Sequence, residues 1–144
     1  MKNLICILMP ILIVAMLVGV AGYVHLTSPE MRNKAQIKKE DAAVREYVLR
    51  TIPLGTDMEA AQKIIEEQTV WEIEWTADDH GYGVRPGGSP TPYNEENMVG
   101  EKSMEIHLGE YPSFLMTTDV FAFLGFDGDG KLIDVAIRTE NDSL

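Results

Sequence analysis

Two short stretches of the sequence combine residue types that bind metal ions in proteins. Asp78 and Asp79 directly precede His80, so two carboxylates and an imidazole are neighbours in the chain. The string DGDGK at residues 127–131 begins like a calcium loop, with two aspartates two positions apart. A calcium loop also needs an acid or amide at its fifth position and a glycine at its sixth, where this chain has a lysine and a leucine. The string therefore predicts a tight turn between two strands.

Other patterns of catalytic or metal chemistry are missing from the sequence. His80 has no second histidine at helical spacing, so we expect no metal site there. The chain contains no nucleophile elbow, phosphate-binding glycine loop or His-Glu-x-x-His motif. We predict no catalytic, cofactor-binding or metal-ligating residue, no cofactor and no enzymatic activity. The alternative is an envelope enzyme or a ligand sensor that uses His80 or His107 and the long loop described below.

The overall charge is strongly acidic. The chain has 12 Lys and Arg against 23 Asp and Glu, which gives a formal net charge of -11. Such a surface repels phosphate backbones, so we exclude nucleic acid as a partner. A protein partner would be basic, because complementary charge favours association. The single cysteine, Cys6, excludes an intrachain disulfide and a zinc site built from several cysteines.

Residues 4–24 form an uncharged apolar run of 21 residues. As a helix, the run is long enough to cross a hydrocarbon core of about 30 Å. A cleaved signal peptide is the alternative, since Lys2 and the small residues near Ala21 fit one, but the run exceeds the usual hydrophobic region of a signal. We expect residues 1–25 to be a membrane anchor, or an uncleaved signal, of a single-pass cell-membrane protein. Its domain is expected outside the cytoplasm, although the basic residues at 32–39 favour the opposite orientation.

Behind the anchor, the sequence predicts a stalk and a small domain. Residues 26–41 are mostly polar and are expected to form the stalk. Residues 42–144 have the length of one small domain, which we expect to be α+β. Its first helix should end near Thr51, because Pro53 forces the preceding residue out of the helical region.

A second helix is predicted to follow. Thr56 and Glu59 have the spacing of a capping box, in which two side chains bond to unpaired amides of the first turn. An apolar stripe then continues to about Gln68. We therefore expect two helices that pack on a sheet.

Alternating apolar and polar residues predict an antiparallel sheet of three or four strands. The strands are expected at residues 71–75, 103–108, 120–126 and 132–138. Glycine and proline are frequent at 77–102, so we expect a flexible loop there, with residues 84–100 mobile. Trp71 and Trp75 are expected in the core, with an aromatic ligand box as the alternative.

The alternation also divides the expected sheet into two faces. The residues expected to face the helices are Trp71, Ile73, Trp75, Met104, Ile106, Leu108, Ile133, Val135 and Ile137. The residues expected on the other face are Glu72, Glu74, Glu105, His107, Asp134 and Arg138. We interpret this acidic face, beside an apolar third strand, as the binding face for a basic partner. The alternative is a face whose carboxylates are merely solvated.

Two longer stretches resemble a known family. They read IPLGTDMEAAQKIIEE at residues 52–67 and FAFLGFDGDGKLIDVAI at residues 121–137. With the order of helices and strands, they resemble the small outer-membrane-assembly lipoproteins (SmpA/OmlA type) and the related β-lactamase-inhibitor-like fold over about residues 42–138. The matching positions are Gly55, Thr56, Phe126, Asp127, Gly130 and Leu132. The chain departs from the lipoprotein pattern because it has no lipid-bearing cysteine.

This resemblance implies a capped helix packed on a small antiparallel sheet, and a binding module of the cell envelope without catalytic residues to carry over. With the apolar run, it leads us to predict a non-catalytic protein-interaction module, tethered to the membrane by residues 4–24.

Overall fold

The structure is a computed structural model that describes residues 28–93 and 97–143. The chain divides into two units, residues 1–32 and 33–144, and the described part of the first unit is the start of helix α2 (Pro29–Ile37). Among the described residues, no helix is long and apolar enough to cross a membrane. The predicted anchor at residues 4–24 lies outside the described residues, so it stays a prediction.

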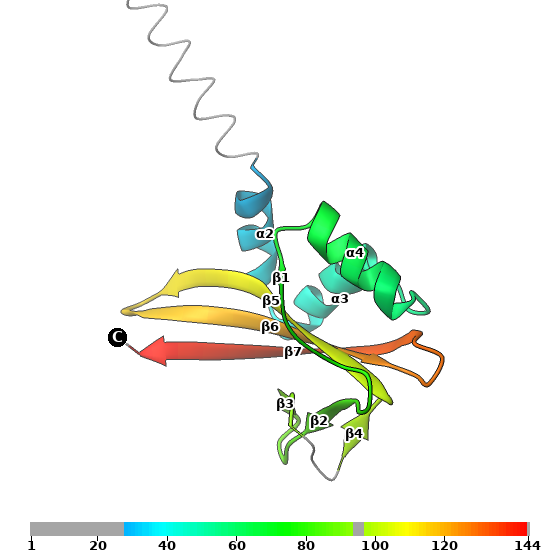
Figure 1. The fold of residues 1–144 in the computed structure, drawn as a ribbon. Coiled ribbons are helices and arrows are strands. Elements are labelled where there is room, and N and C mark those ends of the chain that lie inside the picture. Colours follow the sequence, from blue (N-terminus) through cyan, green and yellow to red (C-terminus); the bar gives the residue numbers. More distant parts are fainter. Residues whose placement is uncertain (1–27, 94–96, 144) are drawn as a thin grey trace, which may run out of the picture. The chain divides into compact units, whose positions relative to one another are not determined.

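The second unit contains helices packed on an antiparallel sheet, so the predicted α+β class is confirmed (Figure 1). Its helices are α3 (Asp41–Thr51) and α4 (Met58–Gln68), which end where the sequence predicts. The main sheet has the order β1-β5-β6-β7, with β1 (Glu72–Ala77), β5 (Lys102–Ser113), β6 (Met116–Phe126) and β7 (Leu132–Ser143). A smaller sheet has the order β3-β2-β4, with β2 (Tyr82–Val84), β3 (Pro90–Thr91) and β4 (Met98–Val99).

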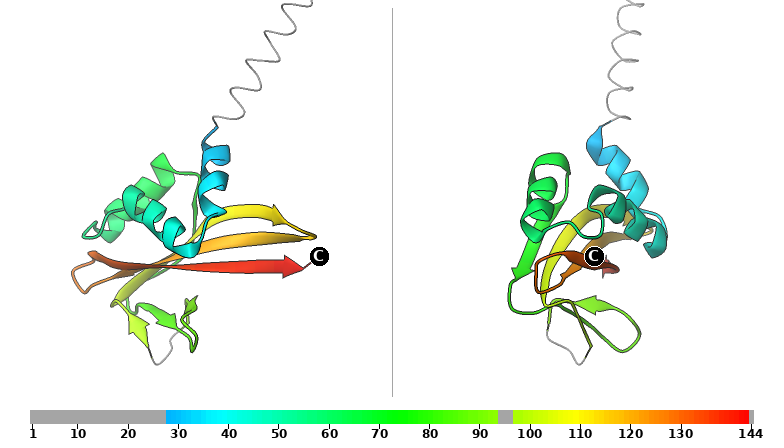
Figure 2. Two further views of the ribbon diagram at one scale, coloured as in Figure 1. Left: turned by 180° about the vertical axis from the view of Figure 1, so that it is seen from behind. Right: turned by 90° about the vertical axis from the view of Figure 1, so that its right-hand side faces the viewer.

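Helices α3 and α4 cover one face of the main sheet, and the smaller sheet lies on the opposite side (Figures 1 and 2). The helices contribute the buried residues Val44, Val48, Ala61 and Ile65 to the core. The two central strands contribute Met104, Ile106, Leu108, Val120, Ala122, Leu124 and Phe126, which are all buried. Burial of this apolar surface is the main favourable contribution to folding of the unit.

A bulge in β1 corrects the expected position of Trp75. Ile73 pairs with Ile106, but the next pair is Trp75 with Glu105. Glu74 is therefore an extra residue in β1. Because side chains alternate between the faces, one extra residue moves the residues after it to the opposite face. Trp75 consequently lies on the face away from the helices, although the sequence pattern assigned it to the core.

A second irregularity corrects the position of Ile133. Phe126 pairs with Leu132 and Gly125 pairs with Asp134, which leaves Ile133 without a partner in the ladder. Leu132 takes the core position, and Ile133 is 46% exposed. The expectation that Ile133 faces the helices is therefore wrong.

The segment expected to be one long loop at 77–102 instead contains the smaller sheet. Its buried aromatic residue is Tyr82, whose ring centroid lies 5.9 Å from that of Phe123 in the main sheet. The Tyr82 hydroxyl donates a hydrogen bond of 2.9 Å to Asp134. These contacts hold β2 against the main sheet, while the mobility predicted for residues 84–100 stays a prediction.

The capping box expected at Thr56 and Glu59 is also wrong. The residue before α4 is Asp57, and its side chain makes no capping hydrogen bond. Thr56 Oγ1 instead donates a hydrogen bond of 2.6 Å to the carbonyl oxygen of Pro53.

The turn predicted at residues 127–131 is confirmed, and it also holds the start of α4. The Asp127 amide donates to the Lys131 carbonyl oxygen at 2.9 Å, which closes the turn. The Met58 amide donates to the Gly130 carbonyl oxygen at 2.9 Å, which satisfies an amide of the helix start. Gly130 has a positive φ of 77°, a conformation that costs glycine little.

Candidate functional site

The face of the main sheet away from α3 and α4, here called the open face, carries the candidate site. Its chemically distinctive residues are Glu72, Glu74, Trp75, Glu105, His107, Asp119, Phe121, Phe123, Asp134, Arg138 and Glu140. This set includes all six residues that the sequence placed on the outer face. The structure divides those six among three groups of contacts, of which the first two adjoin each other through Glu74 and Phe121.

The first group surrounds Arg138, which lies between aromatic rings and carboxylates. Its Nη2 donates a hydrogen bond of 2.9 Å to Glu105 Oε1. Its guanidinium carbon lies 5.1 Å from the ring centroid of Phe121 and 4.7 Å from that of Phe123. The Nε atom lies 2.9 Å from Glu140 Oε1 but makes no hydrogen bond, so this contact is an ion pair only.

Glu105 is the most buried carboxylate of this group, with 8% of its side chain exposed. Burial raises the pKa of Glu105, and the charge of Arg138 opposes that rise. The carboxylates of Glu140 and Glu74 raise the pKa of Glu105 further. A charged residue with a perturbed pKa beside a cleft is a feature of functional sites and also of structural ion-pair networks.

A cleft of about 550 Å³ opens beside this ion pair. Its lining residues are Glu74, Trp75, His80, Pro92, Tyr93, Glu105, Phe121 and Arg138. The Trp75 ring centroid lies 5.3 Å from that of His80, and the ring of His80 is held by Asp79 through a 2.6 Å contact. Tyr93 is 68% exposed. The described lining therefore combines aromatic rings with two carboxylates, and both kinds of group attract cations. Glu105 is already paired with the cation Arg138, so a guest cation would meet the carboxylate of Glu74.

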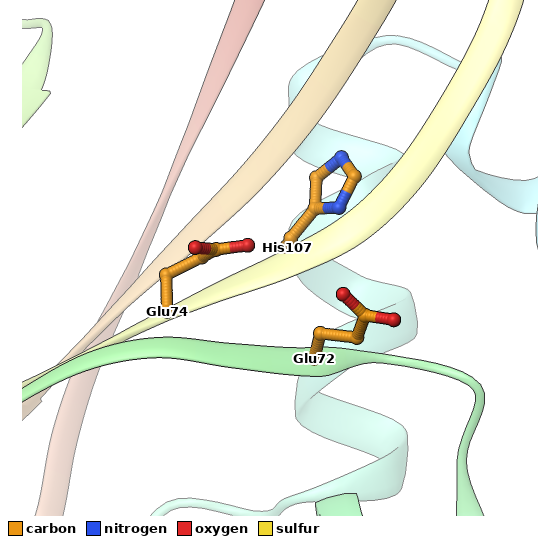
Figure 3. A group of neighbouring side chains, drawn as sticks. All are labelled: Glu72, Glu74 and His107. Carbon is orange, nitrogen blue, oxygen red and sulfur yellow. The ribbon is translucent and has the colours of Figure 1, made fainter.

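The second group contains Glu72, Glu74 and His107, where β1 pairs with β5 (Figure 3). One oxygen of each carboxylate and one ring nitrogen all lie within 4.8 Å of one another. Figure 3 shows both carboxylates pointing toward the imidazole ring. The His107 Nε2 atom lies 3.0 Å from Asp119 Oδ1, so the ring already has one carboxylate partner.

The third group holds Asp134 at the edge strand β7. Arg45 donates a hydrogen bond of 2.7 Å to Asp134 Oδ1, and Tyr82 donates one to Oδ2. Burial pushes the pKa of Asp134 upward, but the hydrogen bonds from Arg45, Tyr82 and the amide of Val135 outweigh it and lower the pKa. Asp134 therefore serves to join α3, β7 and the smaller sheet, and it does not line the cleft.

Sequence reasoning missed several residues of the open face. Trp75 was missed because the alternation of Glu72, Ile73 and Glu74 continues without a break, so the bulge leaves no signal. Asp119 was missed because β6 begins earlier than its apolar pattern does. The partner of Asp119 in β5, Glu110, gives no signal either, because Glu110 has the parity of the core residues Ile106 and Leu108 and is shifted by the irregularity after His107.

Comparison with protein-family models, with curated proteins and with solved structures gives no match to this chain. The resemblance to the outer-membrane-assembly lipoproteins therefore stays an expectation that rests on its two sequence stretches.

Proposed function

We propose that the chain is a membrane-tethered, non-catalytic module of the cell envelope whose open face binds a basic segment of a protein partner. The observation that carries this proposal is the cleft, where Trp75 and Tyr93 lie beside the carboxylate of Glu74. Arginine and lysine side chains are attracted to aromatic faces by about 0.5–2 kcal/mol and to carboxylates by charge.

The overall charge supports the same partner. A net charge of -11 steers basic molecules toward the chain and repels acidic ones. Such steering acts mainly on the association rate and weakens with added salt. The aromatic cleft would then supply the specificity, because stacking needs defined geometry.

The contents of the cleft favour binding over catalysis. Its described lining contains no Ser, Thr, Cys or Lys side chain, so a nucleophile there would have to be a Glu, His or Tyr side chain. Glu105, the titratable group with a raised pKa, is already held by Arg138. His80 lines the cleft, whereas His107 belongs to the separate group with Glu72.

A ligand sensor is the second candidate function, because about 550 Å³ falls within the range of small-molecule pockets. It differs from the first candidate in the size of the ligand. A small cation such as an alkylated amine would then bind as tightly as a basic peptide.

The binding proposal is tested with the full chain in a mild detergent, with a chelator present. The probes are eight-residue peptides of equal length that contain none, two or four arginines. We expect affinity to rise with arginine count. Glu74→Lys should weaken binding of the four-arginine peptide at least tenfold more than Glu67→Lys, which makes the same charge change on α4.

Trp75→Ala should weaken binding of the same peptide by about tenfold, the equivalent of 1.4 kcal/mol. Equal losses for the Glu74→Lys and Glu67→Lys variants would show that net charge alone attracts the peptide, which would refute the cleft as the site. Circular dichroism of each variant checks that it folds.

The tether is tested separately. The full protein should remain in the membrane fraction after an alkaline wash, because the apolar run at 4–24 is long enough to span a bilayer. Release of a shorter product that begins near Gly22 would show cleavage and would overturn the anchor.

A further inference from the structure

The group of Glu72, Glu74 and His107 has the composition of a metal site. We infer that these three side chains bind one divalent first-row transition-metal ion, for which Zn²⁺ is a suitable probe. Two carboxylate oxygens and one imidazole nitrogen are a common kind of donor set for such ions. This inference goes beyond the proposed function and does not depend on it.

The antiparallel pairing of β1 with β5 creates the juxtaposition. Glu72 lies directly across the ladder from His107. Glu74 follows two positions later as the extra residue of the bulge, and its carboxylate lies close to the same imidazole. Bulges are frequent beside functional sites because they redirect side chains.

The distances are close to those that a bound ion requires. Ligand atoms that surround an ion at 2.0–2.2 Å are about 3–4.4 Å apart. The three candidate ligand atoms lie within 4.8 Å of one another. Both glutamates are exposed, so small rotations of their side chains suffice to close the remaining gap.

The imidazole is held in place by its other contacts. Nε2 lies 3.0 Å from Asp119 Oδ1, and the ring packs on Phe121 with 5.0 Å between centroids. When Nε2–H donates to Asp119, the lone pair is on Nδ1, which is then free to bind an ion. A carboxylate behind a ligating histidine is the usual arrangement in metal sites, where it orients the ring and raises its basicity.

Electrostatics also favours a cation at this place. Within residues 28–93 and 97–143, no lysine or arginine forms an ion pair with Glu72 or Glu74. Two like charges side by side repel each other, and a divalent ion would remove that repulsion. The imidazole donor favours transition metals over Mg²⁺ and Ca²⁺, which prefer oxygen ligands alone. Three protein ligands leave further coordination positions for water.

The test uses the full chain in a nonionic detergent, purified without a polyhistidine tag and stripped of metal with a chelator. Zn²⁺ is titrated by calorimetry, and thermal unfolding is recorded with and without Zn²⁺. We expect one ion per chain and a higher unfolding temperature, because an ion that binds the folded state stabilises it. Mg²⁺ at the same concentration should produce no shift.

Three variants locate the site. His107→Ala should weaken Zn²⁺ binding at least tenfold, and Asp119→Ala should weaken it by about tenfold to hundredfold. The matched control is His80→Ala, since His80 also lies against a carboxylate, Asp79. Unchanged binding in His107→Ala, or a loss in His80→Ala equal to that in His107→Ala, would overturn the assignment.

The double variant E72Q/E74Q removes both carboxylates without disturbing the fold, because both side chains are exposed and the change is isosteric. It should fold as the wild type does and lose the Zn²⁺-dependent rise in unfolding temperature. Electron paramagnetic resonance with Cu²⁺ supplies an independent readout, in which coupling to one nitrogen is expected. A bound Cu²⁺ without nitrogen coupling would contradict the role of His107.

Discussion

The two faces of the main sheet use the same four strands but bury opposite kinds of side chain. The helix-covered face buries aliphatic residues such as Ile106 and Leu124. The open face buries an ion pair, Glu105 with Arg138, beside two phenylalanine rings. Apolar burial is non-directional and depends on the apolar area removed from water, whereas a buried charge needs a partner at a defined place. We therefore expect the helix-covered face to contribute most of the stability, while the open face carries exposed carboxylates and a cleft.

The largest effect is expected on the helix-covered face. Ile106→Ala should lower the free energy of unfolding by about 2–5 kcal/mol, because it leaves a cavity in the core. Ile133→Ala deletes the same atoms from a side chain that the irregularity in β7 turns outward, and should cost under about 1 kcal/mol. Urea unfolding followed by tryptophan fluorescence measures both. Similar losses in the two variants would contradict the placement of Ile133.

A somewhat smaller loss is expected for the buried ion pair of the open face. Arg138→Met should lower the free energy of unfolding by about 1–3 kcal/mol, since it leaves Glu105 without its partner. Arg45→Met breaks the ion pair between Arg45 and Asp134, in which the two side chains are 43% and 40% exposed. Because the pair is exposed to water, this variant should lower the free energy of unfolding by under about 1 kcal/mol. A larger loss of stability for Arg45→Met than for Arg138→Met in urea unfolding would contradict the stabilising role of the buried pair.

The pH dependence of stability should reveal Asp134. Its pKa is lower in the folded than in the unfolded chain, so its stabilising contribution is present above the usual value of 3.8 and is lost as pH falls through the folded value. Asp134→Asn should therefore be less stable than the wild type at pH 7, by under about 1 kcal/mol given its exposure. The difference should shrink below pH 3.8. Tyr82→Phe, which removes one donor to Asp134, should flatten the pH dependence of stability, and an unchanged profile would argue against that bond.

The smallest free energy of local opening is expected for the smaller sheet, which covers part of the open face. Strands β3 and β4 have two residues each, so few hydrogen bonds protect their amides. Hydrogen exchange should be faster in β3 and β4 than in the central strands β5 and β6. Equal protection would show that the smaller sheet unfolds only with the whole unit.

Much of the candidate site could be expected from residue order, but its grouping could not. Period-two alternation placed Glu72, Glu105 and Arg138 on one face, because side chains of a strand alternate regardless of their neighbours. The contacts between Glu72 and His107 depend on which residues face each other across two strands. That register joins positions far apart in the chain and leaves no local pattern.

The amino-acid sequence alone was enough to predict the α+β class, the ends of two helices and the turn at 127–131. These features depend on local physics: the restriction that Pro53 places on the backbone, the periodicity of apolar residues and the turn preference of glycine. The bulge at Glu74 and the smaller sheet around Tyr82 could be recognised only in the folded chain. A bulge and a strand of two or three residues are both stabilised by contacts with neighbouring strands. Those strands lie far away in the sequence, so no short stretch of residues predicts the contacts.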